Sequence, residues 1–424
     1  MAVVRCAASG WGAVYGHSTA NSMSAYRPDM TWDVIVVGLG AMGAATVAEL
    51  ARRGRRVLGL DRFALPHALG SSQGGTRIIR EAYFEHPLYV PLVQRAYARW
   101  QALERETGAR LVVPTGGLTI GPPDGRLVSG ALESARTHGL SHEVLTAAEV
   151  MRRHPAVRVP GGSVAVAEPR AGVILAARAI AALIEVARRN GAEIRTGAPI
   201  AAWDVVDGHV RVVVDGETMK ADRLVLAAGS WLPALVPELA SALEVERNVV
   251  HWFRPAATAT PPIGAAAFGP DRLPVLVIED TPEHLLYAVP SMRAEGDGLE
   301  DGVKFACHHS GAMAATADAV DRQPSAADVA AIRPDVSRYL PALDPEPVRS
   351  SVCTYTNTPD SHFLVDRHPR HDAVILVSPC SGHGFKFATV LGDLVADLVE
   401  DVNVHGMLAP FAAGRYSSAG NSRR

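Results

Sequence analysis

One stretch of this sequence, between Asp33 and Asp61, constrains the fold more than any other: DVIVVGLGAMGAATVAELARRGRRVLGLD. Its parts follow one another as a strand, a glycine-rich turn, a helix and a second strand. These parts are residues 34–37, the glycines Gly38, Gly40 and Gly43, residues 44–53 and residues 56–60. The acidic residue Asp61 ends the second strand. This order predicts a βαβ unit that binds a dinucleotide.

Each conspicuous position of the unit has a physical reason. Gly38 makes the turn, Gly40 lets the backbone approach a pyrophosphate, and Gly43 lets the helix lie close to the strand. The helix N-terminus offers free N–H groups and a positive dipole end to the phosphates. Asp61 is positioned to accept hydrogen bonds from ribose hydroxyls. The motif by itself leaves open which dinucleotide is bound.

Length and composition set further limits. A chain of 424 residues is long enough for two domains with sizeable cores. The formal net charge of −3 argues against a nucleic-acid partner, and four scattered cysteines without a C-x-x-C pair argue against a disulfide framework or a metal finger. No uncharged apolar window of about 18 residues is present, so we expect no membrane partner and a cytoplasmic location.

Residues 1–29 differ from the rest of the sequence. They lack apolar periodicity, and glycines interrupt the apolar stretch that a secretory signal needs. We expect a disordered extension or an upstream start assignment, with Met30 as an alternative beginning.

The remaining pattern predicts an α/β fold with an inserted α+β domain. Residues 62–80 are rich in glycine and serine and predict a loop, whereas residues 175–190 and 386–400 have helical apolar spacing. Asp207-Gly208 predicts a hairpin turn. Residues 240–350 carry many prolines and strand-like runs, which favours a mainly antiparallel sheet.

We therefore predict a Rossmann-like nucleotide-binding domain built from discontinuous segments, and a separate substrate domain. The nucleotide-binding segments are residues 30–110, 172–243 and 358–424. The substrate-domain segments are residues 111–171 and 244–357.

Two clusters in the first and third quarters of the chain carry candidate chemistry. Arg77 and Arg80, in TRIIR, are three residues apart and share one side of a turn, where they would face a carboxylate or a cofactor edge. Surface arginines are the alternative interpretation. In KFACH, strand spacing places Lys304 and His308 on one face, which is either part of a cleft or a solvated face.

Two more clusters lie near the end of the chain. Ser351, Cys353 and Tyr355 share one face of a strand, although a single cysteine there is also typical of a small buried hydrophobe. His383 and Lys386 sit where a helix begins. Lysine has the wrong sign for a helix N-terminus, which indicates a bound anion unless the side chain is simply solvated.

Together the motifs TRIIR-x-AY, K-x-x-x-H, C-x-Y-T-x-T-x-D-x-H-F and SGHGFKF resemble the monomeric sarcosine oxidase and N-methyltryptophan oxidase family. These are flavoprotein amine oxidases of the D-amino-acid-oxidase-like superfamily, and the resemblance covers residues 32–408. It implies an FAD-dependent oxidase of secondary α-amino acids, which forms an imine and reduces O2 to hydrogen peroxide. We expect a monomer that acts on a small-molecule amino acid.

The resemblance also implies roles for individual residues. Cys353 matches the cysteine that forms a thioether to the flavin, and Lys304 matches the lysine that promotes the reaction of reduced flavin with O2. Arg80 and Lys386 match the pair that clamps the substrate carboxylate. Arg77 matches the arginine beside the flavin ring.

The complete set of expected site residues follows from these matches. The expected catalytic residues are Lys304, His308, Arg77, Tyr355 and His383. The expected substrate-binding residues are Arg80, Lys386 and Tyr287. The expected cofactor-binding residues are Gly38, Gly40, Ala41, Met42, Gly43, Asp61, Thr76, Arg77, Ile200, Gly229, Cys353, Gly382, Gly384, Phe385 and Lys386.

The sequence departs from the family pattern at two places that border the expected pocket. Residues 71–75 read SSQGG where the family carries a histidine and an aspartate, and the stretch between Tyr287 and Lys304 is longer than in sarcosine oxidase. Sarcosine itself is therefore not fixed as the substrate. The alternatives are an oxidase of a cyclic imino acid of the pipecolate or proline type, a flavin dehydrogenase with another electron acceptor, and a NAD-binding regulatory protein.

Overall fold

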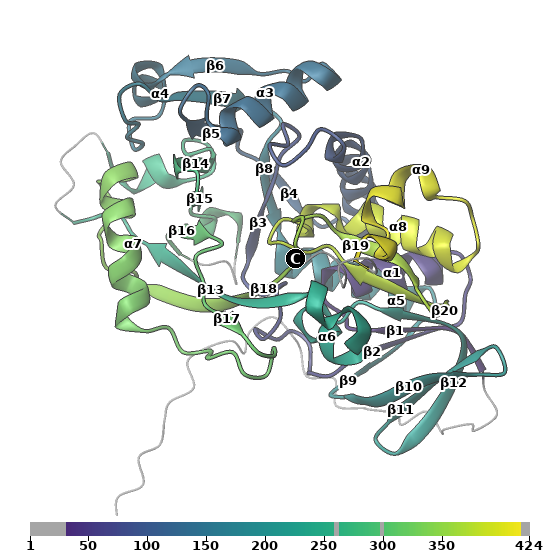
Figure 1. Ribbon diagram of the computed structural model, residues 1–424. Helices are drawn as coiled ribbons and strands as arrows, with labels where there is room; N and C mark the ends of the chain where they lie inside the picture. The colour runs from purple at the N-terminus through teal and green to yellow at the C-terminus, as the bar shows by residue number, and fades with distance from the viewer. Residues whose placement is uncertain (1–30, 258–262, 297–300, 417–424) are drawn as a thin grey trace, which may run out of the picture.

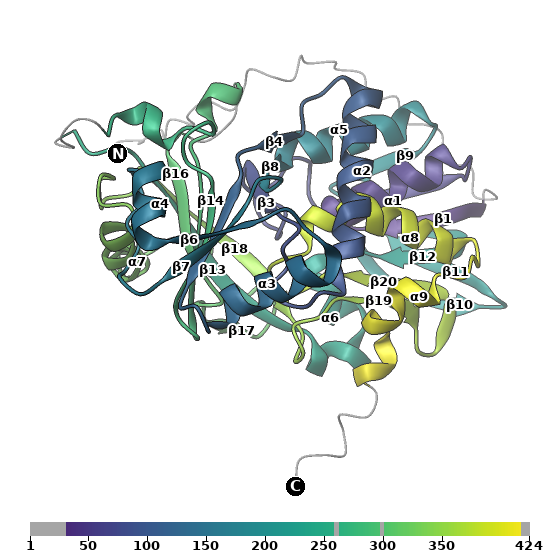
Figure 2. The same ribbon diagram turned by 90° about the horizontal axis from the view of Figure 1, so that it is seen from above.

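The computed structural model describes residues 31–257, 263–296 and 301–416 (Figure 1). Residues 1–29, for which the sequence predicts a disordered extension, lie outside this part. The described residues form two large sheets with a small sheet between them, and both views show this arrangement (Figures 1 and 2). Among the described helices, none combines the length and the apolar character that a membrane crossing needs.

The first large sheet contains the dinucleotide unit. Its strands are β1 (Thr31–Val37), β2 (Val57–Asp61), β9 (Glu193–Thr196), β10 (Ile200–Val206), β11 (His209–Val214), β12 (Glu217–Leu226), β19 (Leu364–His368) and β20 (His371–Ser378). Strands β20, β12, β1, β2 and β9 run parallel in that order, and β10 and β11 extend β12 as an antiparallel meander. The Rossmann-like character predicted from the sequence is confirmed.

Apolar residues on both faces of β1 explain why this strand is central. Val34 and Val36 pack under the helices, whereas Ile35 and Val37 pack on the opposite face with residues of the meander. Successive strand residues point to opposite faces, so an uninterrupted apolar run is the pattern of a strand that is covered on both sides.

Helices cover one face of this sheet. They are α1 (Ala41–Arg52), α2 (Tyr89–Thr107), α5 (Ala176–Arg189) and α8 (Ala388–Val399), and α1 packs against both α5 and α8. The predicted helices over 44–53, 175–190 and 386–400 are confirmed with small changes at their ends. The predicted hairpin is confirmed too, since Asp207 (φ 51°) and Gly208 (φ 81°) both adopt the positive φ of a type I′ turn.

The second large sheet is mainly antiparallel, as predicted. Its strands are β5 (Gly117–Gly121), β6 (Glu143–Thr146), β7 (Val164–Glu168), β13 (Glu244–Phe253), β14 (Val275–Thr281), β15 (His284–Val289), β16 (Val303–His308), β17 (Met313–Ala314) and β18 (Arg349–Asn357). Helices α3 (Arg126–His138), α4 (Ala147–Arg153) and α7 (Ala326–Tyr339) accompany it, and the short helices α6 (Leu232–Leu235) and α9 (His405–Leu408) lie nearer the first sheet (Figure 1). The domain boundaries drawn from the sequence stay a prediction.

The small sheet corrects one expectation. Its strands are β3 (Thr76–Ile79), β4 (Val112–Pro114) and β8 (Gly172–Leu175). The sequence predicted a loop through residue 80, but Thr76–Ile79 pairs antiparallel with β8. The run Ile78-Ile79 supplies β-branched residues that a glycine-rich neighbourhood hides from a composition-based prediction. Arg77 therefore lies on a strand, and Arg80 follows its end, instead of both lying on one side of a turn.

Candidate functional site

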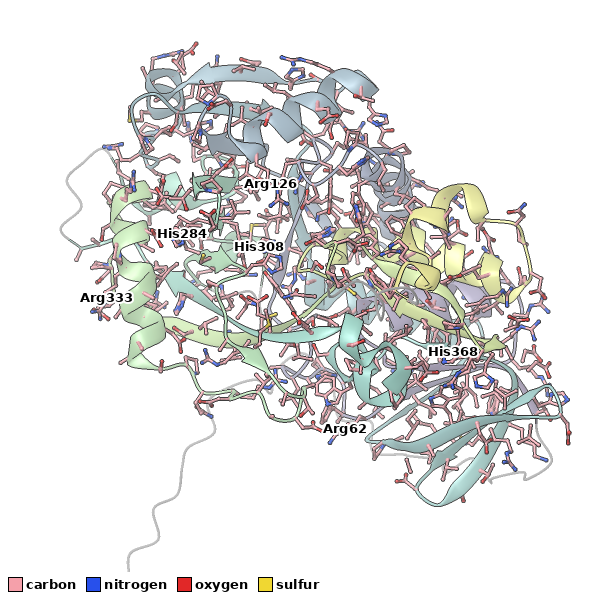
Figure 3. The ribbon with its side chains drawn as sticks, in the orientation of Figure 1. Arg62, Arg126, His284, His308, Arg333 and His368 are labelled. Carbon is pink, nitrogen blue, oxygen red and sulfur yellow. The ribbon has the colours of Figure 1, made fainter. Side chains whose placement is uncertain are left out.

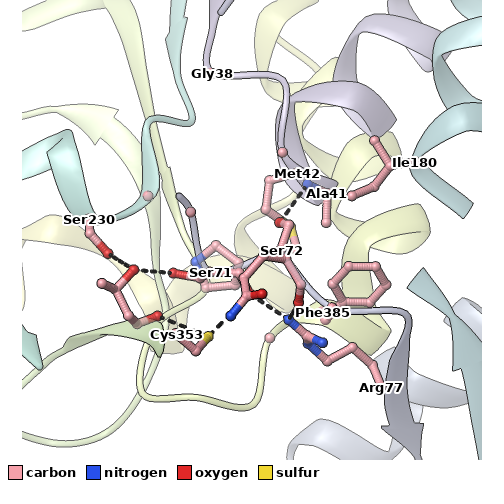
Figure 4. A pocket seen from close by; sticks show the side chains of 18 of the residues that line it. Gly38, Ala41, Met42, Ser71, Ser72, Arg77, Ile180, Ser230, Cys353 and Phe385 are labelled. Atoms are coloured by element: carbon pink, nitrogen blue, oxygen red, sulfur yellow. Dashed lines mark hydrogen bonds between the residues drawn. The ribbon is translucent and has the colours of Figure 1, made fainter. Parts of the chain in front are cut away.

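A cavity of about 1800 Å³ runs between the helices of the first sheet and the strands of the second. Each expected site residue lines it, with the single exception of Gly43. Strands and loops that are far apart in the sequence therefore meet at one place. Figure 4 shows Cys353 on one side of this cavity and Ala41, Met42 and Ile180 on the other.

The nucleotide end of the cavity depends on close backbone approach. A Cβ on Gly43 would lie 1.7 Å from the carbonyl oxygen of Gly38, so Gly43 sits behind the cavity wall and brings α1 onto β1. Gly38 has a φ of 91°, and a Cβ there would lie 2.5 Å from the carbonyl oxygen of Ala227. Both positions require glycine, which is the role that the sequence assigned to them.

Asp61 is buried at the end of β2 and already accepts two backbone hydrogen bonds. Its Oδ2 accepts from the N–H of Leu39 (2.7 Å), and its Oδ1 accepts from the N–H of Phe63 (2.9 Å). Each carboxylate oxygen can accept more than one hydrogen bond, so a ribose hydroxyl can still be bound. The two backbone contacts fix the carboxylate in the cavity wall.

Two cations converge where β3 meets the second sheet. Lys304 Nζ and Arg77 Nη1 both donate to the carbonyl oxygen of Thr76, each at 2.7 Å. Arg77 also donates to the carbonyl oxygens of Ser71 and Gln73 (2.7 and 2.5 Å), and its guanidinium lies 5.5 Å from the ring centroid of Phe385. Lys304 is only 4% exposed, so the alternative of a solvated strand face is excluded for it.

Arg80 also lines the cavity and forms an ion pair with Glu85. Its Nη2 donates to both carboxylate oxygens of Glu85, at 2.9 and 2.7 Å. Burial acts to raise the pKa of Glu85, but Arg80, His383 and Lys386 outweigh it and hold that pKa below its usual range. The sequence predicted that Arg80 binds a substrate carboxylate. It did not predict that the carboxylate of Glu85 already binds this guanidinium.

Lys386 is the second buried cation of this region. Its Nζ donates to the carbonyl oxygen of His383 (2.7 Å) and to the hydroxyl of Tyr83 (3.3 Å). Burial, together with the Arg80 guanidinium, lowers the pKa of Lys386 to about 7, although Glu85 acts in the opposite direction. The solvated-lysine alternative is therefore wrong. The ammonium lies at the 3₁₀ helix η5 (Phe385–Phe387), just ahead of α8.

Aromatic and histidine side chains complete the wall. His308 Nδ1 and the hydroxyl of Tyr355 lie 3.1 Å apart, and burial keeps the pKa of His308 well below its usual value. Figure 3 places His308 toward the centre of the molecule. A Cβ on Gly382 would lie 2.5 Å from the Tyr355 ring and 2.6 Å from His308, so glycine is required there. Burial raises the pKa of Tyr287, which lines the same region.

Cys353 is a buried free thiol on β18, 6% exposed. Its Sγ lies 3.8 Å from the carbonyl oxygen of Ser71 and borders the cavity (Figure 4). The neighbouring Thr354 hydroxyl contacts Ser71 and Ser230 at 3.4 and 2.9 Å. The thiol therefore faces the cavity from a wall that is itself held in place.

Sequence reasoning missed several residues of the site. Glu85 and Tyr83 lie beside the predicted cations, and Ser72 accepts a hydrogen bond from the N–H of Ala41 (3.0 Å) at the start of α1. Tyr83 belongs to the TRIIR-x-AY motif, which was a usable signal. Glu85 follows two residues later and gave none, because a single acidic residue in a loop is usually solvated.

Comparison with known proteins agrees with this geometry. Residues 33–398 match the family described as FAD dependent oxidoreductase (DAO). The monomeric sarcosine oxidase of Streptomyces avermitilis is 39% identical over 87% of this chain and 93% of that protein. The N-methyl-L-tryptophan oxidase of Salmonella newport is 32% identical over 92% of this chain and 100% of that protein.

Solved structures give the same result at the level of the fold. The structure of NikD, an unusual amino acid oxidase essential for nikkomycin biosynthesis, superimposes with a TM-score of 0.78 and 25% identity, over 90% of this chain and 97% of that one. The family match spans most of the chain, and the curated relatives exceed 30% identity over nearly their full length. The chain belongs to the family of FAD-dependent oxidoreductases that contains the sarcosine and N-methyltryptophan oxidases.

Proposed function

We propose that this protein is an FAD-dependent oxidase of secondary α-amino acids. The observation that carries the proposal is the convergence of four buried or half-buried cations on one cavity, in two pairs. Lys304 and Arg77 meet at the Thr76 carbonyl, whereas Arg80 and Lys386, which also line the cavity, meet at the ring of Tyr83. An α-amino acid offers one carboxylate for the second pair, and the first pair remains for the cofactor and oxygen.

The residues present fit FAD. Close packing of Gly43 on Gly38, and of Gly38 on Ala227, brings the N-terminus of α1 to the cavity, which both Asp61 and Lys386 line. When bound, FAD would supply the two-electron acceptor that no protein side chain provides. The ADP part would lie at the N-terminus of α1, with Asp61 toward a ribose.

The clamp would bind the substrate through its carboxylate. Arg80 and Lys386 would each donate to a carboxylate oxygen, and the incoming anion would compete with Glu85 for the Arg80 guanidinium. Because the pKa of Lys386 is about 7, an anion arriving beside it favours the charged ammonium. A fixed carboxylate orients the adjacent C–H and C–N bonds, which lowers the entropic cost of reaching the reactive geometry.

The chemistry balances as a two-electron oxidation. The substrate loses a C–H and an N–H hydrogen as the C–N bond becomes C=N, and O2 takes up two electrons and two protons to give hydrogen peroxide. Water then hydrolyses an acyclic imine. His308 and Tyr355 line the cavity in their uncharged forms, because burial disfavours the imidazolium and the phenolate. Neither side chain would therefore attract or repel the substrate amine through a net charge.

Apolar side chains adjoin the clamp and narrow the substrate class. Phe84, Val277 and Leu285 line the cavity beside Arg80 and pack together in one cluster. The Arg80 guanidinium lies 4.5 Å from the Phe84 ring centroid. A substrate side chain beyond the carboxylate would therefore meet an apolar wall, which favours an N-alkyl amino acid with an apolar side chain over one with a charged side chain.

The covalent link is a separate part of the proposal, in which Cys353 would tether the flavin. If so, acid precipitation of the purified protein leaves yellow flavin in the pellet, and Cys353→Ser moves the colour to the supernatant. Cys307→Ser is the control, because Cys307 is a buried free thiol that does not line the cavity. Colour that leaves the pellet of the unaltered protein would rule the tether out.

A peroxide-coupled screen tests the function itself. We expect hydrogen peroxide from N-methyl amino acids with apolar side chains, and none from the matching N-methyl amides, which lack the carboxylate. Turnover confined to pipecolate- or proline-like rings would favour the cyclic imino acid alternative. Turnover with an artificial acceptor but not with O2 would favour a dehydrogenase, and a protein without flavin would contradict the proposal.

A further inference from the structure

Tyr83 occupies a central position among the clamp residues without lining the cavity. Its side chain is fully buried, and its carbonyl oxygen accepts a hydrogen bond from the Ser134 hydroxyl of α3 (2.5 Å). Arg80, His383 and Lys386 all line the cavity, and all three touch this tyrosine. Tyr83 can therefore act on a ligand through these three side chains.

The direction of the hydrogen bonds around Tyr83 follows from their chemistry. His383 Nε2 lies 3.0 Å from the carbonyl oxygen of Ser361, which can only accept, so Nε2 carries the proton. Burial lowers the pKa of His383 to about 4, so at neutral pH its Nδ1 is an acceptor. The Tyr83 hydroxyl, 2.6 Å from that Nδ1, is the donor, and its oxygen accepts from Lys386 Nζ at 3.3 Å.

The ring of Tyr83 adds a second kind of contact. The Arg80 guanidinium lies 4.4 Å from its centroid, and the Lys386 ammonium lies 5.1 Å from it. Both distances fall within the range of cation–π attraction, which is stronger where the cation is desolvated. One aromatic side chain thus contacts both cations of the clamp and the neutral histidine beside them.

We propose that Tyr83 is a positioning residue, which holds the Lys386 ammonium and the His383 imidazole in one fixed arrangement beside Arg80. The inference rests on the proposed function in one respect, namely that Arg80 and Lys386 bind a carboxylate. The hydroxyl accepts from Lys386 and donates to His383, so it fixes the position of the ammonium and the orientation of the imidazole, whose tautomer the Ser361 carbonyl sets.

The charge state of Lys386 makes benzoate binding depend on pH. The pH at which binding is lost would change if Tyr83 positions Lys386, and would not change if Tyr83 only supported the fold. The titratable groups that interact with the Lys386 ammonium are Tyr83, His383, Arg80, Glu85 and His308. Removing the Tyr83 hydroxyl removes an acceptor that stabilises the charged form, so the pKa of Lys386 falls below about 7. The clamp then loses this charge at a lower pH.

The test is calorimetric titration of the holoenzyme with benzoate, a carboxylate that has no oxidisable amine, between pH 6 and 9. Tyr83→Phe keeps the ring and removes the hydroxyl. Tyr97→Phe is the matched control, because Tyr97 is also buried and donates to the carbonyl oxygen of Arg170 (2.7 Å) away from the cavity. Near-UV circular dichroism verifies that each variant keeps its native packing.

We expect Tyr83→Phe to bind benzoate about tenfold more weakly at pH 7, the loss typical of one hydrogen bond to a charged group, and to lose binding at a lower pH than the unaltered protein. Tyr97→Phe should bind as the unaltered protein does. Equal affinity and an equal pH midpoint in Tyr83→Phe would overturn the inference and leave the proposed function standing. Absence of benzoate binding in the unaltered protein would overturn the clamp, and the inference with it.

Discussion

Lys304 shows how one side chain acquires a defined environment from distant segments. It lies on β16, its Nζ donates to Thr76 on β3, and its ammonium is 5.6 Å from the ring centroid of Trp252 on β13. A buried ammonium held this way supplies a fixed positive charge to any anion that develops nearby. Reduction of O2 passes through such an anion.

Replacing Lys304 tests this role directly. We expect Lys304→Met to slow reoxidation of the reduced enzyme by O2 by orders of magnitude, while reduction by substrate changes little. Only reoxidation develops negative charge on oxygen, and Lys304 would stabilise that charge. Stopped-flow absorbance of the flavin separates the two steps. Lys220→Met on the exposed part of β12 is the control. An equal fall of both rates would argue against the oxygen role.

At the scale of secondary structure, the hydrogen bonds of the segment after β3 determine where Arg80 and Tyr83 lie. Glu168, at the end of β7, is buried, and its two carboxylate oxygens accept from the N–H groups of Glu81 (2.5 Å) and Ala82 (2.9 Å). The carbonyl oxygen of Ala82 in turn accepts from Arg80 Nη1 (2.9 Å). A strand of the second sheet therefore holds the chain segment that carries Arg80 and Tyr83.

Removing this carboxylate should weaken the fold locally. We expect Glu168→Ala to lower the free energy of unfolding by about 2–4 kcal/mol, since two buried N–H groups lose their acceptor. Glu168→Gln, which retains one acceptor oxygen, should lose less. Urea denaturation followed by circular dichroism measures both values. Equal stability of Glu168→Ala and the unaltered protein would show that the segment is held by other contacts.

At the scale of the whole molecule, the cavity unites the two large sheets. It is lined by β1 and α1 from the N-terminal segment, by β16 and β18 from the antiparallel sheet, and by residues 377–386 near the C-terminus. A ligand that fills it contacts all these parts only when the chain is folded. Ligand binding should therefore stabilise the complete molecule and not one segment alone.

This coupling gives a prediction that also distinguishes the cofactor. In Cys353→Ser, freed of bound flavin, added FAD should raise the melting temperature, because a ligand at about a hundred times its Kd adds roughly 2.7 kcal/mol to stability. NAD at the same concentration should have little effect. Differential scanning calorimetry measures both. Stabilisation by NAD but not by FAD would return the chain to the NAD-binding alternative.

Local pattern was sufficient for the elements that carry strong periodicity or turn chemistry. The apolar run at 34–37, the glycines Gly38 and Gly43, and the hairpin at Asp207-Gly208 all form as predicted, because their constraints act within a few residues. Strand β3 was missed, because its partner β8 lies about a hundred residues away in the sequence. The local composition around residues 76–79 does not reveal a pairing over that distance.

The sequence by itself determined the dinucleotide unit, the family resemblance and a list of motif residues, nearly all of which line the cavity, because motif spacing encodes them directly. Only the tertiary structure decided how those residues interact. The Arg80–Glu85 ion pair, the sharing of Thr76 by Lys304 and Arg77, and the contacts of Tyr83 each depend on burial and on distances between separate segments. Charge state and hydrogen-bond direction follow from that environment, which a linear pattern does not contain.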